Sequence, residues 1–109
     1  MTEQEVARAA STVLRFFERE CPGDSRVRLA IEARRKWAAG ALSRTALAVA
    51  LRGAKAAALD LAPPAPRSKQ SASRNAARYA AKAAGYPAEF CEQMVWLAKW
   101  YGKEVDRES

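Results

Sequence analysis

The sequence predicts an all-α fold, a single-domain bundle of about five helices with a Pro-rich linker between the third and fourth helices. Three observations predict this fold. Apolar residues recur at the three- and four-residue spacing of a helix that buries one face, and no stretch alternates as a strand does. Every glycine and proline except Gly53 lies where a helix can begin or end. A chain of 109 residues can bury one core and is too short for two ordinary domains.

The predicted domain covers the whole chain, residues 1–109. Its expected helices are residues 3–20, 25–39, 44–61, 74–84 and 87–102, and its linker is residues 62–73. Many of the hydrophobic residues are alanine, which buries little area and allows helices to pack closely. The larger expected core residues are Val13, Leu14, Phe17, Ile31, Trp37, Leu47, Leu51, Phe90, Met94, Leu97 and Tyr101.

The first predicted helix, residues 3–20, combines a capping box with one apolar stripe. Thr2 is the expected N-cap and Glu5 lies three residues later, so each side chain can accept a backbone N–H. The stripe follows at helical spacing with Val6, Ala9, Ala10, Val13, Leu14 and Phe17. We expect the helix to end before the turn at residues 21–23.

The second predicted helix, residues 25–39, has Asp24 as N-cap and ends before Gly40, which can adopt a left-handed conformation. Its apolar arc holds Val27, Ala30, Ile31, Ala33, Trp37 and Ala38. Arg34 falls inside that arc, where an unpaired charge is strongly unfavourable. We therefore expect Arg34 to meet a carboxylate or to extend along its stem toward solvent.

The third predicted helix, residues 44–61, starts after Ser43 as N-cap, and its buried face holds Leu47, Ala50, Leu51, Ala54 and Ala58. Gly53 destabilises this helix by about 0.5–1 kcal/mol relative to alanine, which suggests a close helix approach or a slight bend. The linker that follows contains Pro63, Pro64 and Pro66, which favour extended backbone.

The fourth predicted helix, residues 74–84, is rich in alanine, with Ser71 or Ser73 as N-cap and Gly85 at its end. The fifth, residues 87–102, begins at Pro87, which suits a first turn. Its buried side is expected to hold Phe90, Met94, Leu97, Ala98 and Tyr101. On the opposite side, Trp96 and Trp100 lie among charged residues, which is typical of an interface unless another segment covers them.

The sequence offers little chemistry for catalysis. It contains no histidine, so neither an imidazole base nor an imidazole metal ligand is present. Its two cysteines do not have the spacing of a zinc or redox motif. The Gly-Ala-Lys sequence at residues 53–55 is not a phosphate-binding loop, because the upstream glycine, the following Ser or Thr and the preceding strand are absent. The acidic residues Glu18, Glu20 and Asp24 are explained by a helix end and a cap. We therefore expect no enzyme activity, no metal and no cofactor.

The expected cellular compartment and the distribution of charge indicate which kinds of partner the protein can bind. No stretch approaches the roughly 18 apolar residues of a membrane span, and the polar start is unlike a signal peptide, so we expect a cytoplasmic protein. The formal net charge is +7. No acidic residue lies between Asp60 and Glu89, where the basic residues are Arg67, Lys69, Arg74, Arg78 and Lys82. This segment is either a solvated face or a surface for nucleic acid or an acidic protein.

Residues 14–60 carry most of a recognisable pattern, formed by Phe17, Glu18, Pro22, Asp24, Arg26, Arg28, residues 30–33, Trp37 and Gly40. This pattern resembles that of the immunity-five-like proteins of bacterial polymorphic toxin systems. The resemblance implies a protein that binds a toxin rather than a catalyst. The second half departs from the family pattern, because Arg52 and Lys55 stand where relatives carry histidines.

Three hypotheses for the function follow. The first is an immunity protein that neutralises a cognate bacterial toxin by steric or electrostatic blocking, with contact residues Arg28, Glu32, Arg35, Trp96 and Trp100. On the second helix, Arg28 and Glu32 also have the spacing of an i, i+4 ion pair. The second is a basic nucleic-acid-binding module that uses Arg67, Lys69, Arg74, Arg78 and Lys82 on phosphates. The third is a homo-oligomeric scaffold closed through the two tryptophans of the fifth helix.

Overall fold

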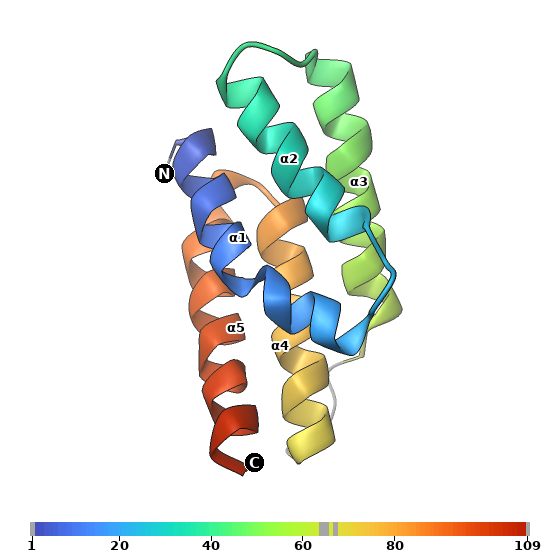
Figure 1. Cartoon of the computed structure of the whole chain (residues 1–109), viewed down its shortest axis with the longest axis vertical. Coiled ribbons are helices and arrows are strands. Elements are labelled where there is room, and N and C mark those ends of the chain that lie inside the picture. Colours follow the sequence, from blue (N-terminus) through green and yellow to red (C-terminus); the bar gives the residue numbers. More distant parts are fainter. Residues whose placement is uncertain (1, 64–65, 67, 109) are drawn as a thin grey trace.

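Five α-helices account for nearly all of the computed structural model, which describes residues 2–63, 66 and 68–108 (Figure 1). The helices are α1 (Glu3–Glu20), α2 (Arg26–Ala38), α3 (Arg44–Asp60), α4 (Lys69–Gly85) and α5 (Ala88–Glu108). The described residues contain no strand. The predicted all-α, single-domain fold is therefore confirmed.

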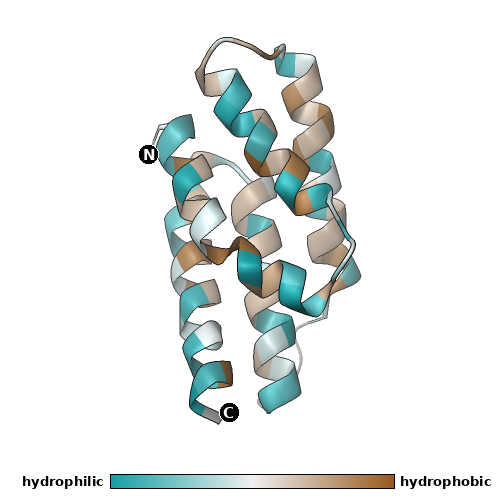
Figure 2. Cartoon of the chain, in the orientation of Figure 1, coloured by the Kyte–Doolittle hydropathy of each residue, from teal (hydrophilic) through white to brown (hydrophobic). Residues whose placement is uncertain are grey.

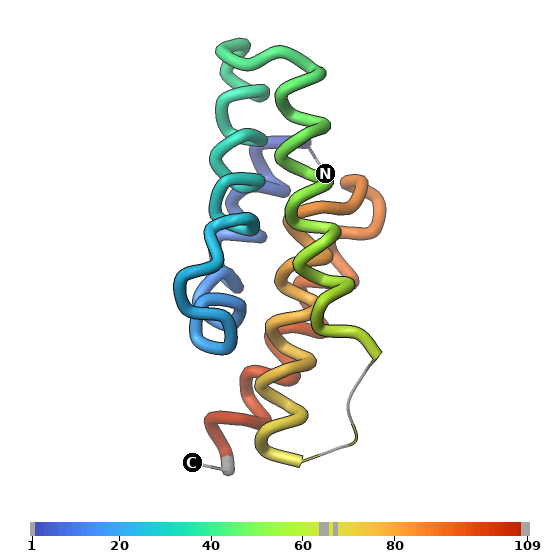
Figure 3. Tube along the Cα trace, turned by 90° about the vertical axis from the view of Figure 1, so that its right-hand side faces the viewer, coloured from blue at the N-terminus to red at the C-terminus, as the bar shows by residue number. Residues whose placement is uncertain are grey.

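Helix α4 is the centre of the bundle. It packs against α1, α3 and α5 and also touches α2, while α2 lies across α1 and α3. In the side view of Figure 3, the loop between α2 and α3 forms one end of the molecule, and the end of α5 and the start of α4 form the other. Most of the buried side chains of α4 are alanine methyl groups, so its neighbours can approach it from several directions.

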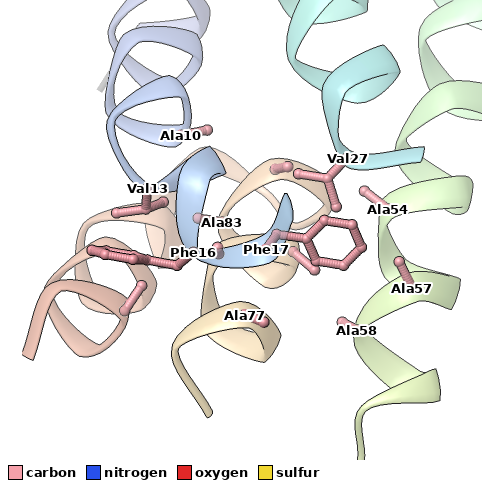
Figure 4. Packing of buried hydrophobic residues seen from close by; sticks show 14 of the residues in the cluster. Ala10, Val13, Phe16, Phe17, Val27, Ala54, Ala57, Ala58, Ala77 and Ala83 are labelled. Atoms are coloured by element: carbon pink, nitrogen blue, oxygen red, sulfur yellow. The ribbon is translucent and has the colours of Figure 1, made fainter. Parts of the chain in front are cut away.

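The core lies where α1 faces the other helices. Phe16 and Phe17 point in different directions from α1, and Phe17 reaches toward Val27 of α2 and Ala54 of α3 (Figure 4). Both phenylalanines are buried, Phe16 at 5% exposure and Phe17 at 0%. Hydropathy alternates along α1 and α5, which leaves one polar side on each helix (Figure 2). The sequence analysis included Phe17 in the core but missed Phe16.

The caps confirm several predicted boundaries. Thr2 and Glu5 form the capping box, with backbone-to-side-chain distances of 3.1 and 3.2 Å, and the Ser43 hydroxyl accepts the N–H of Ala46 at 3.1 Å. Gly40 has a φ of +76°. The N–H groups of Gly40 and Ala41 donate to the carbonyls of Trp37 and Lys36, which is the Schellman pattern.

The start of α4 and the end of α5 differ most from the sequence prediction, and the other helix ends agree with it to within one residue. Helix α2 begins at Arg26, and Asp24 accepts the Arg26 N–H at 3.0 Å from just outside the helix. Helix α4 begins at Lys69 rather than residue 74, because the hydroxyl of Ser68, not of Ser71 or Ser73, accepts the N–H of the first turn. Residues 64, 65 and 67 of the predicted linker lie outside the described residues. Helix α5 continues past residue 102 to Glu108.

The buried face of α5 is rotated relative to its prediction. Phe90 is 50% exposed and Leu97 is only half-buried. The buried residues of this helix are Cys91, Val95, Ala98, Gly102 and Val105. A Cβ added to Gly102 would lie 2.4 Å from Cζ of Phe16, so the absence of a side chain allows α1 and α5 to approach. Small residues, rather than the largest ones, therefore face the core.

Two further expectations are corrected in α2 and α3. Trp37 is half-buried rather than in the core, with the Arg44 guanidinium 5.8 Å from its ring centroid, and Ala38 is exposed. Gly53 does not mark a tight approach, because a Cβ there would meet the Arg26 side chain at 3.7 Å. The close approach to α3 is made by Gly85 instead. A Cβ at Gly85 would lie 2.8 Å from the backbone nitrogen of Lys55.

Arg34 is the most deeply buried charge among the described residues, at 1% exposure. Its Nη1 donates to Oε2 of Glu3 at 2.6 Å, and its Nε donates to the Ala84 carbonyl at 2.9 Å. Its Nη2 donates to the Tyr86 carbonyl. The expected carboxylate partner is thus present. The guanidinium also satisfies two carbonyls at the end of α4, so it joins three helices.

We predict that Arg34→Met lowers the free energy of unfolding by about 3–5 kcal/mol, because it leaves Glu3 and two carbonyls without their donor. Arg34→Lys should recover only part of this loss, since an ammonium group lacks the planar fork that reaches three acceptors. Urea unfolding followed by circular dichroism measures both. The control is Arg35→Met on the exposed side of α2, expected within about 0.5 kcal/mol of the wild type. Equal losses at both positions would contradict the assignment.

The two helical glycines with opposite surroundings give a second prediction. Gly102→Ala should destabilise the protein by about 1–3 kcal/mol, because the new methyl group overlaps the Phe16 ring. Gly53→Ala should stabilise it by about 0.5–1 kcal/mol, because the methyl group fits and alanine favours the helix. Thermal and urea unfolding of the two variants side by side measure the difference. A stabilised Gly102→Ala variant would show that α1 and α5 are not packed as described.

Candidate partner-binding surfaces

The family-like residues at the turn between α1 and α2 form an ion-paired framework. Arg28 donates to both carboxylate oxygens of Glu18, at 2.6 and 3.0 Å. These hydrogen bonds raise the pKa of Arg28. The predicted pair between Arg28 and Glu32 is therefore replaced by a pair across two helices. Arg28 remains half-exposed, with 51% of its side chain accessible.

A second part of this framework joins α2 to the end of α3. The Arg26 guanidinium contacts Asp24 and Asp60, with Nη2–Oδ2 distances of 2.7 Å in both cases. The hydrogen bonds that Arg26 donates to Asp24 lower the pKa of the Asp24 carboxyl. The hydrogen bonds to Asp24 and Asp60 together raise the pKa of Arg26. Asp24, Arg26 and Asp60 therefore fix the orientation of α2 against α3, which explains them without a partner.

The outer face of α2 is exposed, as predicted. Arg28, Glu32, Arg35 and Lys36 all lie on it. Arg35 bends toward α1, where its Nη2 donates to the Ser11 hydroxyl at 2.7 Å. Two of the three predicted contact residues of this helix, Arg28 and Arg35, are thus partly held by α1, and the face presents charges in fixed positions.

The two tryptophans of α5 have different surroundings. Trp96 is 61% exposed and lines a shallow hollow with Glu89, Glu92 and Gln93. Trp100 is half-buried, and its ring meets the edge of Tyr101 at a centroid distance of 4.8 Å and an angle of 82°. Trp96 is therefore an accessible aromatic side chain, and Trp100 packs beside it against the bundle.

The predicted contact residues belong to two separate surfaces. Within the described part of the chain, α2 and α5 do not touch, because α1 and α4 lie between them. The structure thus does not bring Arg28, Glu32 and Arg35 together with Trp96 and Trp100. Figure 1 shows α2 and α5 on different sides of α1 and α4.

The predicted basic series is not a continuous row of free cations. Arg67 lies outside the described residues, and Lys69 is exposed in the first turn of α4. The guanidinium of Arg74 donates from Nε to the Leu61 carbonyl at 3.1 Å, so Arg74 satisfies the end of α3. Arg78 and Lys82 lie over the Tyr79 ring, at 5.2 and 5.7 Å from its centroid. Sequence spacing could not reveal these acceptors and rings.

The described residues contain no cluster of three or more groups suited to hold a metal ion, and none of their helices is long and apolar enough to cross a bilayer. Both cysteines are free thiols. Burial, followed by the charges of Asp24 and Glu20, raises the pKa of Cys21, and burial raises the pKa of Cys91. Neither thiol is activated as a nucleophile.

A comparison with known families decides the class of this protein. Residues 6–89 match the family described as "Imm-5 like putative immunity protein". The chain belongs to this Imm-5 like family. No curated protein and no solved structure matches it.

The family match covers the framework of the Imm-5 like chain and leaves out most of α5. It includes the Arg34 side chain with its two carbonyl acceptors, and the ion pairs at the start of α2. It ends at Glu89, before the exposed Trp96. The immunity family implies a protein toxin as partner in general.

The Asp24 carboxyl gives a pH-dependent prediction. Its pKa is lowered in the folded protein, so it stabilises the fold above its ordinary pKa, and the contribution is lost as pH falls through the folded value. Asp24→Asn should therefore be less stable than the wild type at pH 7. Urea unfolding from about pH 7 to pH 2 should show the two curves converging below about pH 4. A difference that stays constant would contradict the role of Asp24.

Proposed function

We propose that this Imm-5 like protein binds a cognate bacterial toxin and neutralises it by covering its active site or blocking its substrate. The family supplies the general immunity role. The residues support binding rather than turnover, because histidine is absent and both thiols have raised pKa values. The observation that carries the choice of surface is the exposure of Trp96, at 61% of its side chain.

Trp96 has the properties of an interface anchor. A tryptophan buries a large apolar area on binding and loses few rotamers, which is why exposed tryptophans often dominate binding energy. The hollow around Trp96 carries Glu89 and Glu92, and these carboxylates can pair with basic residues at the rim of a toxin surface. The outer face of α2, with Arg28, Glu32 and Arg35, is a second contact surface in this proposal.

Nucleic acid is the weaker candidate partner. Binding to a phosphate backbone requires a row of cations that are free to neutralise phosphates. Arg74 instead donates to the carbonyl of Leu61 at the end of α3, which interrupts the predicted row. A homo-oligomer held together by Trp96 would bury the same indole that we assign to toxin binding. Sedimentation of the wild type and of Trp96→Ala shows whether the protein associates with itself through this residue.

The test pairs this chain with the toxin encoded by the neighbouring gene. Cells that express the toxin should survive when they also express the wild-type protein, and the two purified proteins should form a complex. Death of cells that express both proteins, or no complex between the purified chains, overturns the proposal.

The surface is tested with Trp96→Ala. We predict that this variant binds the toxin with a Kd raised about thirtyfold, the effect of a hot spot worth about 2 kcal/mol. Its free energy of unfolding should stay within about 0.5 kcal/mol of the wild type, because the side chain is mostly exposed. Val49→Ala, an exposed apolar residue of α3, is the matched control and should leave the Kd unchanged. Isothermal titration calorimetry measures both, and equal effects would contradict the role of Trp96.

A further inference from the structure

A second surface combines positive charge with aromatic rings. It is formed by α3, α4, the turn after α4 and the start of α5. Its residues, which we call the basic–aromatic face, are Lys55, Arg78, Tyr79, Lys82, Tyr86, Phe90 and Met94. Sequence spacing places Arg78 and Lys82 in a linear series and does not connect them with Lys55 or with the rings.

The cations of this face lie over tyrosine rings. The Lys55 ammonium is 5.4 Å from the Tyr86 centroid, and the Lys82 ammonium is 6.0 Å from the same ring and 5.7 Å from Tyr79. The close approach at Gly85 sets this geometry, because it places the backbone of Lys55 against the end of α4. Cation–π contacts of this kind hold an ammonium group in place but leave its charge uncompensated.

Within the described ranges, none of these cations is paired with a carboxylate. Among the described residues, Lys55, Arg78 and Lys82 take part in no ion pair, and Nε of Arg78 is buried without a hydrogen-bond acceptor. Burial and the charge of Arg78 lower the pKa of Lys82. Helices α3 and α4 contain only one acidic residue, Asp60, which binds Arg26. The part of the face on α3 and α4 is therefore a site of positive potential, which favours an anionic group that approaches it, while the carboxylates of Glu89 and Glu92 lie on the α5 side.

An apolar hollow adjoins the cations. Lys82, Tyr86, Phe90 and Met94 line it, and its volume is about 180 Å³. A cavity of about 150 Å³ can hold a benzene-sized ring, so the hollow is large enough for part of one apolar side chain. Phe90 forms one wall and is 50% exposed, so its ring is accessible to a partner.

We propose that the basic–aromatic face binds an acidic segment of the partner toxin, which rests on the function proposed above. Carboxylates of the segment contact the ammonium groups of Lys55 and Lys82, and one apolar side chain enters the hollow beside Phe90. Charge complementarity identifies the occupant as anionic. The Imm-5 like family, whose partner is in general a protein toxin, favours an acidic protein segment over a nucleic acid. Glu89, which lines the Trp96 hollow, directly precedes Phe90 in the chain.

The first experiment needs no toxin. The probe is a five-residue synthetic peptide with one tryptophan between pairs of glutamates, titrated into the labelled protein and followed by ¹H–¹⁵N spectra. We expect the amide signals of Lys55, Lys82 and Tyr86 to shift. A peptide with glutamines in place of the glutamates should bind at least about tenfold more weakly, which is about 1.4 kcal/mol. Equal binding of the two peptides overturns the proposal.

Matched variants locate the site. Lys82→Glu should weaken binding of the acidic peptide at least about tenfold, and Lys82→Arg should bind nearly as the wild type does. Lys36→Glu makes the same charge change on the exposed face of α2 and should change the Kd less than about twofold. Phe90→Ser tests the hollow, with Val49→Ser as its control at a similarly exposed apolar position. Circular dichroism of each variant confirms that it is folded.

The remaining outcomes separate this proposal from the proposed function. An oligothymidylate that shifts the same signals, when the acidic peptide does not, assigns the face to nucleic acid and overturns the proposal. If the peptide binds as expected but the toxin does not bind, the basic–aromatic face is supported as a site for acidic segments and the immunity function is contradicted. If Lys82→Glu neutralises the toxin as well as the wild type and the peptide does not bind, the function stands and the face fails.

Discussion

The buried guanidinium of Arg34 is the interaction on which the rest of the structure depends. A charge with 1% exposure is tolerated only when it is paired and hydrogen-bonded, and here each of the three guanidinium nitrogens has an acceptor, from Glu3 and the carbonyls of Ala84 and Tyr86. These contacts determine where α4 ends and how the chain turns into α5. They also place Tyr86, whose ring holds Lys55 and Lys82. A structural ion pair thus positions a surface for binding.

Local signals were sufficient to predict the helices, and the requirement for a partner of Arg34 was also visible in the sequence. The capping box at Thr2, the cap at Ser43 and the left-handed Gly40 depend on neighbouring residues only, so they could be predicted. The identity of the Arg34 partners could not, because backbone carbonyls have no sequence signature. The start of α4 was also ambiguous, since three serines in a short stretch could each act as its cap.

Tertiary packing determines which side of α5 is buried and which groups the predicted basic residues contact. Periodicity gives most weight to large apolar residues, and it therefore assigned Phe90 to the core. The face that packs is the one where Gly102 admits the Phe16 ring, a match between two helices that one helix cannot reveal. Arg74 similarly binds the end of α3, while Trp96 stays exposed among charges as its neighbours suggested.

The alanine-rich interior of α4 restricts how this protein can change. Alanine has no rotamers to lose on burial, so a helix surrounded by its neighbours is assembled at low entropic cost. The same positions have no space for a larger side chain, and almost every replacement there adds volume to a full interior. Divergence toward new partners is therefore confined to the outward residues of the bundle. The buried alanines of α4 therefore tolerate few substitutions, whereas the outward-facing residues of the bundle tolerate many.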